Sequence, residues 1–241
     1  RRVMLAFERR VAAMADAIVC VSGRDRRELA RVVAAEPFSR AHVVAAAYDE
    51  ALFDAVEPSL PEPALAHRLL ILGRLSHQKN VPLALAVLEE LVGAGEPYSL
   101  TVAGRGEGCK ELIRLIARSP AAANVRWVGA VPHDQVPGLL REHGILMLTS
   151  RYEASPTVVK EALRAMRPVV STDVGDVADW LDPDATGFVC TATPESLAEG
   201  VRRATRLVED GRYHATRHIS ELDESRLMNQ VITVYRQLAM L

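Results

Sequence analysis

From residue 69 onward, short apolar or β-branched runs alternate with longer segments whose apolar positions recur at helical spacing. The short runs predict strands at 69–73, 98–104, 125–131, 145–150, 168–173 and 187–190. The longer segments predict helices at 80–95, 109–119, 134–143, 156–166, 194–210 and 223–241. Strands separated by helices in this way favour right-handed crossovers and a parallel sheet covered on both faces. We therefore predict a doubly wound, Rossmann-like α/β fold that binds its ligands beyond the carboxyl ends of the strands.

The first 58 residues carry a shorter version of the same pattern. Apolar runs predict strands at 15–22 and 41–47, with a helix at 24–35 between them. Three prolines within residues 57–63 predict a linker, because proline ends regular structure and stiffens the chain. Two strand–helix pieces are too few to build a core of their own. We therefore predict that residues 1–58 are the tail of an N-terminal α/β domain and the start of the linker.

The loop after the strand at 145–150 carries a signal for the start of a helix. Ser155 is predicted to cap the helix and Pro156 to be its first residue. The backbone N–H groups of Thr157 and Val158 then have no partner inside the helix. We expect them to point into the crevice at the sheet edge, where a helix start favours a phosphate.

Two glutamates flank this helix start. Glu153 stays in the loop, and Glu161 lies inside the helix, roughly two turns from the cap. A ligand with a diphosphate in the middle, a sugar at one end and a ribose at the other fits this spacing. The alternative is that both glutamates are solvated surface charges.

A second loop, at 71–80, follows the first strand of this sheet. It contains Gly73 and Arg74 and places Lys79 just before a helix. Arginine forks onto phosphate oxygens, and lysine supplies a compact point charge. The loop therefore predicts two cations that face the same crevice, although either one alone reads equally well as an exposed charge near a turn.

A third loop, at 102–108, contains Gly104 and Gly106. Glycine at these positions is expected to let the backbone approach a ligand closely. The rival interpretation is a dinucleotide site, which requires a third glycine opening a helix and an acid about 20 residues later. Asp134 lies too far along the chain to serve as that acid, so the loop disfavours NAD binding.

Composition and charge narrow the classes of function. The net charge of −2 supplies no bulk field for nucleic acid or an anionic membrane. Cys20, Cys109 and Cys190 form no metal or redox spacing, which favours free thiols and a cytoplasmic location. No apolar run approaches the ~18 residues of a transmembrane segment. Basic residues within 1–14 leave peripheral membrane attachment as an alternative to a plain surface helix.

One segment of the chain resembles the Asp-x-Asp metal-binding motif but lacks its surroundings. Asp182 and Asp184 form an Asp-x-Asp triplet, but the triplet follows no apolar strand and leads into a glycine turn. We therefore predict no metal site.

The three loops, in this order, resemble the C-terminal half of family 4 glycosyltransferases, which have the GT-B fold. The segments "GRLSHQKN", "VAGRGEG" and "VRWVGAVPHDQVPGLL" look like motifs of that family. The stretch "LTSRYEASPTVVKEALRAMRPVVSTDVGD" resembles its signature of two glutamates separated by seven residues. The resemblance covers about residues 68–210 and extends more weakly through 8–54.

The resemblance implies a retaining transfer of a hexose-type sugar from a nucleotide-diphosphate sugar, without metal or cofactor. It implies that Glu153 contacts the hydroxyls of the donor sugar, Glu161 the ribose, and the backbone around Val131 the base. Diphosphate contacts are implied for Arg74, Lys79, Thr157 and Val158. Glu153, Arg74 and Lys79 are the implied catalytic residues. The acceptor is a glycan, a lipid-linked sugar or a small molecule.

The resemblance also divides the chain. Residues 59–222 are expected to form the donor-binding domain, and the helix at 223–241 to pack back toward residues 1–58. The chain has no initiator methionine and reads as a fragment that lacks the front of the acceptor-side domain. It departs from the family at Arg167, where a small residue is usual, and at 175–181 near the sugar.

Other functions stay open at this point. The absent front of the acceptor-side domain makes a non-catalytic nucleotide-sugar binding module, which needs a partner chain, the main alternative. A sugar-nucleotide epimerase or an NAD-dependent enzyme on a related sheet is a weaker one.

Overall fold

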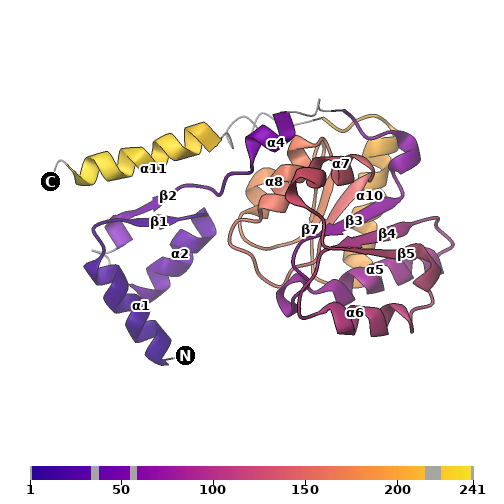
Figure 1. Ribbon diagram of the computed structural model, residues 1–241, viewed down its shortest axis with the longest axis horizontal. Helices are drawn as coiled ribbons and strands as arrows, with labels where there is room; N and C mark the ends of the chain where they lie inside the picture. The colour runs from indigo at the N-terminus through magenta and orange to yellow at the C-terminus, as the bar shows by residue number, and fades with distance from the viewer. Residues whose placement is uncertain (1, 34–37, 55–58, 215–223, 240–241) are drawn as a thin grey trace.

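The computed structural model describes residues 2–33, 38–54, 59–214 and 224–239. Its main feature is a six-stranded, fully parallel sheet in the order β5-β4-β3-β6-β7-β8 (Figure 1). The strands are β3 Arg68–Leu72, β4 Ser99–Ala103, β5 Val125–Gly129, β6 Ile145–Leu148, β7 Val169–Thr172 and β8 Gly187–Cys190. This confirms the doubly wound, Rossmann-like α/β fold.

Successive strand residues point to opposite sides of the sheet, so an apolar strand has side chains to bury on both faces. Helices cover both faces of this sheet. Leu69 and Ile71 of β3 belong to one buried cluster and Leu70 to another. The first cluster is covered by α5 Val81–Gly93, α6 Cys109–Ile116 and α10 Pro194–Glu209. The second is covered by α7 Val136–Arg141, α8 Thr157–Arg164 and α9 Val177–Trp180. We call residues 59–214 the sheet domain.

The N-terminal unit comprises residues 2–33 and 38–44. It contains α1 Arg2–Met14, β1 Ile18–Cys20, α2 Gly23–Val32 and β2 Ala41–Val43. Its two strands pair in parallel, with Ile18 opposite Ala41, and form a sheet of only two strands. A connecting segment, residues 45–54, contains α4 Glu50–Asp54 and contributes Tyr48 and Phe53 to the second cluster of the sheet domain.

The last described helix, α11 Glu224–Leu238, lies on the same side of the molecule as β1 and β2 (Figure 1). The domain boundaries predicted at residues 58 and 222 fall outside the described residues, so the three-part division stays a prediction. The predicted linker at 57–63 is described from residue 59 onward, and a short 3₁₀ helix, η1 Pro63–Leu65, follows it.

The predicted elements are found, with shorter bounds in places. The strands predicted at 15–22 and 41–47 are three residues each. The helix predicted at 134–143 begins as a 3₁₀ turn, η4 His133–Gln135, and continues as α7. Pro137 is compatible with this helix because it lies in the first turn of α7, where its missing N–H is not needed.

Candidate functional site

Two loops meet at the carboxyl edge of the sheet. Since β3 and β6 are paired neighbours, the loop after β3 (73–80) and the loop after β6 (149–156) leave the sheet together. The Arg151 amide donates to the Gln78 carbonyl at 2.8 Å, and the Gln78 side chain donates to the Tyr152 carbonyl at 2.9 Å. The Thr149 hydroxyl donates to the Lys79 carbonyl at 3.0 Å. The two loops therefore form one hydrogen-bonded wall.

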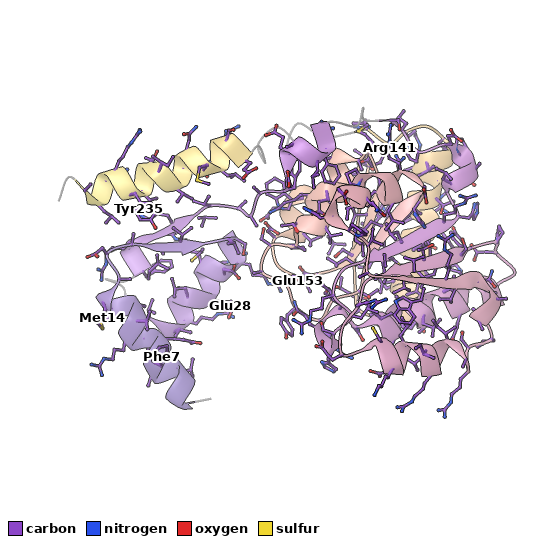
Figure 2. The ribbon with its side chains drawn as sticks, in the orientation of Figure 1. Phe7, Met14, Glu28, Arg141, Glu153 and Tyr235 are labelled. Atoms are coloured by element: carbon purple, nitrogen blue, oxygen red, sulfur yellow. The ribbon has the colours of Figure 1, made fainter. Side chains whose placement is uncertain are left out.

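Lys79 and Glu153 form an ion pair within this wall. Lys79 Nζ lies 2.7 Å from Glu153 Oε1, and the two side chains are 19% and 10% exposed. The same oxygen accepts a hydrogen bond from the Ser150 hydroxyl at 2.7 Å. Figure 2 shows Glu153 on the side of the sheet domain that faces the N-terminal unit. Glu153 is thus no solvated surface charge, and its carboxylate is held in a fixed position.

Glu161 is buried on α8 and faces charges from three other segments. Its carboxylate oxygen lies 3.7 Å from His133 Nε2 of η4. Burial raises the pKa of Glu161, while His133 and Lys79 act to lower it and Asp49 adds to the increase. Lys79 therefore acts on the carboxylate of Glu161 as well as pairing with that of Glu153. His133 was not predicted as a site residue, because in the sequence it reads only as a turn residue before a helix.

The start of α8 differs from the prediction in its cap. Pro156, not Ser155, occupies the capping position, and no side chain caps this helix. The prediction of Ser155 as cap was wrong because its hydroxyl is engaged elsewhere. It donates to Asp176 Oδ2 at 2.6 Å and accepts from Lys160 Nζ at 2.6 Å.

The uncapped start of α8 leaves its first backbone amides without a side-chain acceptor. The N–H groups of Thr157 and Val158 are therefore available to an anion. A phosphate at this helix start stays a prediction, and the residue that was to cap the helix has another role.

Arg74 pairs with an acid other than Glu153. Its guanidinium is paired with Glu107 at 3.3 Å, and its side chain is 76% exposed. Glu107 belongs to the loop after β4, so Arg74 links the second and third predicted loops. The structure thus brings Lys79 and Glu153 together and pairs Arg74 with a different acid.

The glycines of the third loop allow close backbone packing, and their approach to a ligand stays a prediction. A Cβ atom at Gly104 would lie 1.8 Å from the Gly73 carbonyl oxygen, and one at Gly106 would lie 2.2 Å from the Leu75 carbonyl oxygen. Gly104 also has φ of +146°, a conformation that side chains disfavour. The two glycines allow the loops after β3 and β4 to touch through their backbones. Gly73 in turn lies against the Lys79 side chain, with 3.4 Å from its Cβ position to Lys79 Cε.

Val131 follows β5 and is partly buried against the second core cluster. It lines a pocket of about 600 Å³ between β5 and α7, together with Val128, Pro132 and Leu139. A role for the backbone around Val131 at the base of a nucleotide stays a prediction.

A buried polar network behind α8 was not predicted. Lys160 is fully buried and donates to the carbonyl of Ala46 at 2.7 Å and to Ser155. Asp176 Oδ2 lies 3.5 Å from its ammonium group, and the Trp180 ring centre lies 5.3 Å away. Burial lowers the pKa of Lys160, and Asp176 opposes that decrease. The network ties the start of α8 to the connecting segment.

Arg167, the departure that replaces a small residue, is also buried. Its guanidinium donates to the carbonyls of Leu140 at 3.0 Å and Arg141 at 3.1 Å, which end α7, and to that of Ser59 at 2.8 Å. Burial lowers its pKa to about 10. Arg167 therefore caps α7 and fixes the chain that enters the sheet domain.

Two further findings concern the residues that the structure describes. No group of three or more His, Cys, Asp or Glu side chains among them is arranged to hold a metal ion. Within the same residues, each helix is too short or too polar to cross a bilayer.

The chain is similar to known glycosyltransferases in sequence and in fold. Residues 55–215, more than half of the chain, match the family described as glycosyl transferases group 1. Alpha-D-kanosaminyltransferase from Streptomyces kanamyceticus is 28% identical over 206 residues, which cover 81% of this chain and 53% of that enzyme. The chain therefore spans about half the length of this curated relative.

Solved structures show the same fold. Sucrose-phosphate synthase from Thermosynechococcus elongatus matches with a TM-score of 0.78 and 19% identity, over 100% of this chain and 62% of that chain. TarM from S. aureus, in complex with Fondaparinux, alpha-GlcNAc-glycerol and UDP, matches with a TM-score of 0.78 and 14% identity. That match covers 98% of this chain and 46% of TarM. The six-stranded parallel sheet is thus the Rossmann-like fold of GT-B glycosyltransferases.

Proposed function

The chain belongs to the glycosyl transferases group 1 family, and from this premise we propose that it binds a nucleotide-diphosphate sugar in the crevice beside Glu153. We place it in family 4 of the glycosyltransferases and assign it the retaining, metal-independent transfer of a hexose-type sugar without a cofactor. The observation that supports this best is the Lys79–Glu153 ion pair in the loops that leave the same sheet edge, one of which leads into the uncapped start of α8.

The roles follow from charge and position. Lys79 and the first amides of α8 would bind the diphosphate, because both present positive charge to the crevice. Glu153 would accept hydrogen bonds from hydroxyls of the donor sugar. Glu161, further along α8, would accept them from the ribose. Arg74 would reach the diphosphate by leaving its exposed pairing with Glu107, which costs little at a solvated surface.

The chemistry of transfer suits such a crevice. When the bond between sugar and phosphate breaks, negative charge grows on the departing nucleoside diphosphate and positive charge on the sugar. A fixed ammonium group and fixed N–H dipoles at the phosphate lower that barrier. The Glu153 carboxylate would stabilise the positive sugar, as carboxylates do in glycosidases.

Two of the matched proteins suggest which donor to test first. The matched TarM structure contains UDP, and the relative from Streptomyces is named for the transfer of kanosamine. We therefore rank a uracil nucleotide first among the donors to be tested. The acceptor would be a glycan, a lipid-linked sugar or a small molecule.

A second candidate function has an observation in its favour. Phe7, Val11 and Met14 of the N-terminal unit are exposed apolar side chains beside a sheet of only two strands. A unit of this kind gains stability by adding strands and apolar cover. The alternative is therefore a nucleotide-sugar binding module that transfers sugar only together with another acceptor-side domain.

Calorimetry tests the proposed donor site. The chain would be titrated in EDTA with UDP, GDP, UDP-glucose, UDP-N-acetylglucosamine and GDP-mannose. We expect one nucleotide series to bind despite EDTA, and Glu161→Gln to weaken that binding about tenfold, since a charged acceptor at the ribose is lost. Glu195→Gln, an exposed glutamate on α10, is the matched control and leaves affinity unchanged. Absence of binding to all five compounds would reject the proposal.

Turnover separates the two candidates. Slow release of free sugar from the donor that binds, measured by chromatography, identifies an enzyme. Binding without any release or transfer over a long incubation identifies the binding module.

A further inference from the structure

Gln78 makes several hydrogen bonds to the loop after β6, which carries Glu153, and no role has been assigned to it so far. Its side-chain amide donates to the Tyr152 carbonyl at 2.9 Å and to Glu153 Oε2 at 3.2 Å. Its own carbonyl accepts from the Arg151 amide at 2.8 Å. A single residue of the loop after β3 therefore holds three successive residues of the loop after β6.

The two oxygens of the Glu153 carboxylate are used unequally. Oε1 accepts from both Lys79 at 2.7 Å and Ser150 at 2.7 Å. Oε2 accepts from Gln78, at the longer distance of 3.2 Å. A carboxylate offers about four acceptor sites, two on each oxygen. Oε2 therefore keeps the capacity to accept a hydroxyl from a ligand.

The partners of Glu153 also differ in charge. Lys79 is a cation, and a bound diphosphate would compete with Glu153 for it. Gln78 and Ser150 are neutral and offer little to a phosphate that Lys79 and the amides of α8 do not already supply. When Lys79 turns to the diphosphate, the neutral partners remain to hold the carboxylate.

We infer that Gln78 is a positioning residue for the sugar end of the donor, acting through Glu153. The inference rests on the proposed function. It adds a residue that orients the Glu153 carboxylate toward the hydroxyls of the donor sugar. An amide suits this position because it orients the carboxylate without neutralising it. A carboxylate at residue 78 would repel Glu153, and an apolar side chain would leave Oε2 free to rotate away.

The inference predicts an effect confined to one part of the ligand. The diphosphate and the nucleoside do not contact Glu153 in the proposed arrangement. Loss of the Gln78 amide should therefore weaken the affinity for a nucleotide sugar and spare the affinity for the nucleoside diphosphate. A disrupted loop would instead weaken both.

The experiment compares Gln78→Leu with the wild-type chain in four titrations, with UDP, UDP-glucose, GDP and GDP-mannose. We expect Gln78→Leu to raise the Kd of the bound nucleotide sugar about fivefold, as the loss of one hydrogen bond to a charged group does. The Kd of the matching diphosphate should change less than about twofold. Gln230→Leu, an exposed glutamine on α11, is the control for the chemical change alone.

A second variant and a melting curve keep the test decisive. Gln78→Glu preserves shape and polarity, so it should fold and still weaken the nucleotide sugar by at least as much as Gln78→Leu. Equal weakening of diphosphate and nucleotide sugar, or no change in either, would overturn the inference while wild-type binding upholds the proposed function. If the wild-type chain binds none of the four compounds, the proposed function fails first and the inference falls with it.

Discussion

The sheet domain and the N-terminal unit are built from the same strand–helix pattern, yet only one of them closes a core. Both buried clusters are formed by residues from Tyr48 onward. The N-terminal unit instead leaves Phe7 65% exposed and Met14 74% exposed on α1 (Figure 2). The difference is one of strand number: six paired strands bury both faces, whereas two short ones do not.

The contrast shows which region carries the candidate site. The sheet domain contains the Lys79–Glu153 ion pair and the start of α8. The N-terminal unit contacts this region through Arg24, which pairs with Asp173 at 3.1 Å. The connecting segment contacts it through the Ala46 carbonyl, which accepts from Lys160 at 2.7 Å, and through the buried rings of Tyr48 and Phe53. Donor binding should thus depend on the stability of one region and only indirectly on the other.

The largest expected effect comes from truncating the core of the sheet domain. Leu146→Ala removes a side chain that is 1% exposed in the central strand, and should lower the free energy of unfolding by about 4 kcal/mol. Val19→Ala in β1, where the side chain is 45% exposed, should cost less than about 0.5 kcal/mol. Urea denaturation measures both. Equal losses would show that the two regions do not differ as described.

The next effect compares Lys160, which contacts the connecting segment, with Arg24 of the N-terminal unit. Lys160→Met leaves the buried Asp176 without its cation and should cost about 3 kcal/mol in urea denaturation. Arg24→Ala removes an exposed pair and should cost less than about 1 kcal/mol. The double variant Lys160→Met with Asp176→Leu should recover part of the loss, since no unpaired charge remains. A double variant as unstable as the single one would refute the ion-pair explanation.

Glu161 sharpens the comparison through pH. Its pKa is raised in the folded state, so its stabilising contribution is complete below the unfolded pKa and is lost as pH rises through the raised value. Glu161→Gln should therefore stabilise the chain at pH 8, on the order of 1 kcal/mol, with a gain that disappears toward pH 4. Thermal melting at both pH values measures it, with Glu195→Gln as control. A gain that grows on acidification would contradict the assigned direction.

The smallest expected effect is on the exposed apolar side chains of the N-terminal unit. Met14→Ser should change the free energy of unfolding by less than about 0.5 kcal/mol, since the side chain makes little buried contact. It should instead reduce concentration-dependent self-association, measured by sedimentation velocity. A large loss of stability would mean that this face is already part of a core.

The order of the elements was predictable, because it rests on patterns that are local. Residues 69–71 alternate between the two buried clusters, and such alternation is typical of a sheet covered on both sides. The ends of the strands then fix which loops meet. The meeting of Lys79 and Glu153 at one edge therefore follows from the fold.

The errors concern partners that are distant in the sequence. Ser155 has a cap pattern, but Lys160 and Asp176 engage its hydroxyl in the folded chain. The close approach of the Gly104 backbone to that of Gly73 was likewise not predicted. Gln78 lies within the segment "GRLSHQKN", but only the geometry shows that it reaches Glu153. Local patterns thus predict positions, whereas the use of each polar group depends on which neighbours the fold supplies.

The central claim is that this crevice recognises a diphosphate through Lys79, and one calorimetric comparison tests it directly. UDP and UMP, together with GDP and GMP, would be titrated into the wild-type chain, Lys79→Ala and the exposed-lysine control Lys110→Ala. We predict that the diphosphate of one pair binds at least about tenfold more tightly than its monophosphate, and that Lys79→Ala alone removes this difference. Equal affinity for diphosphate and monophosphate, or a preference that survives Lys79→Ala, would contradict the claim.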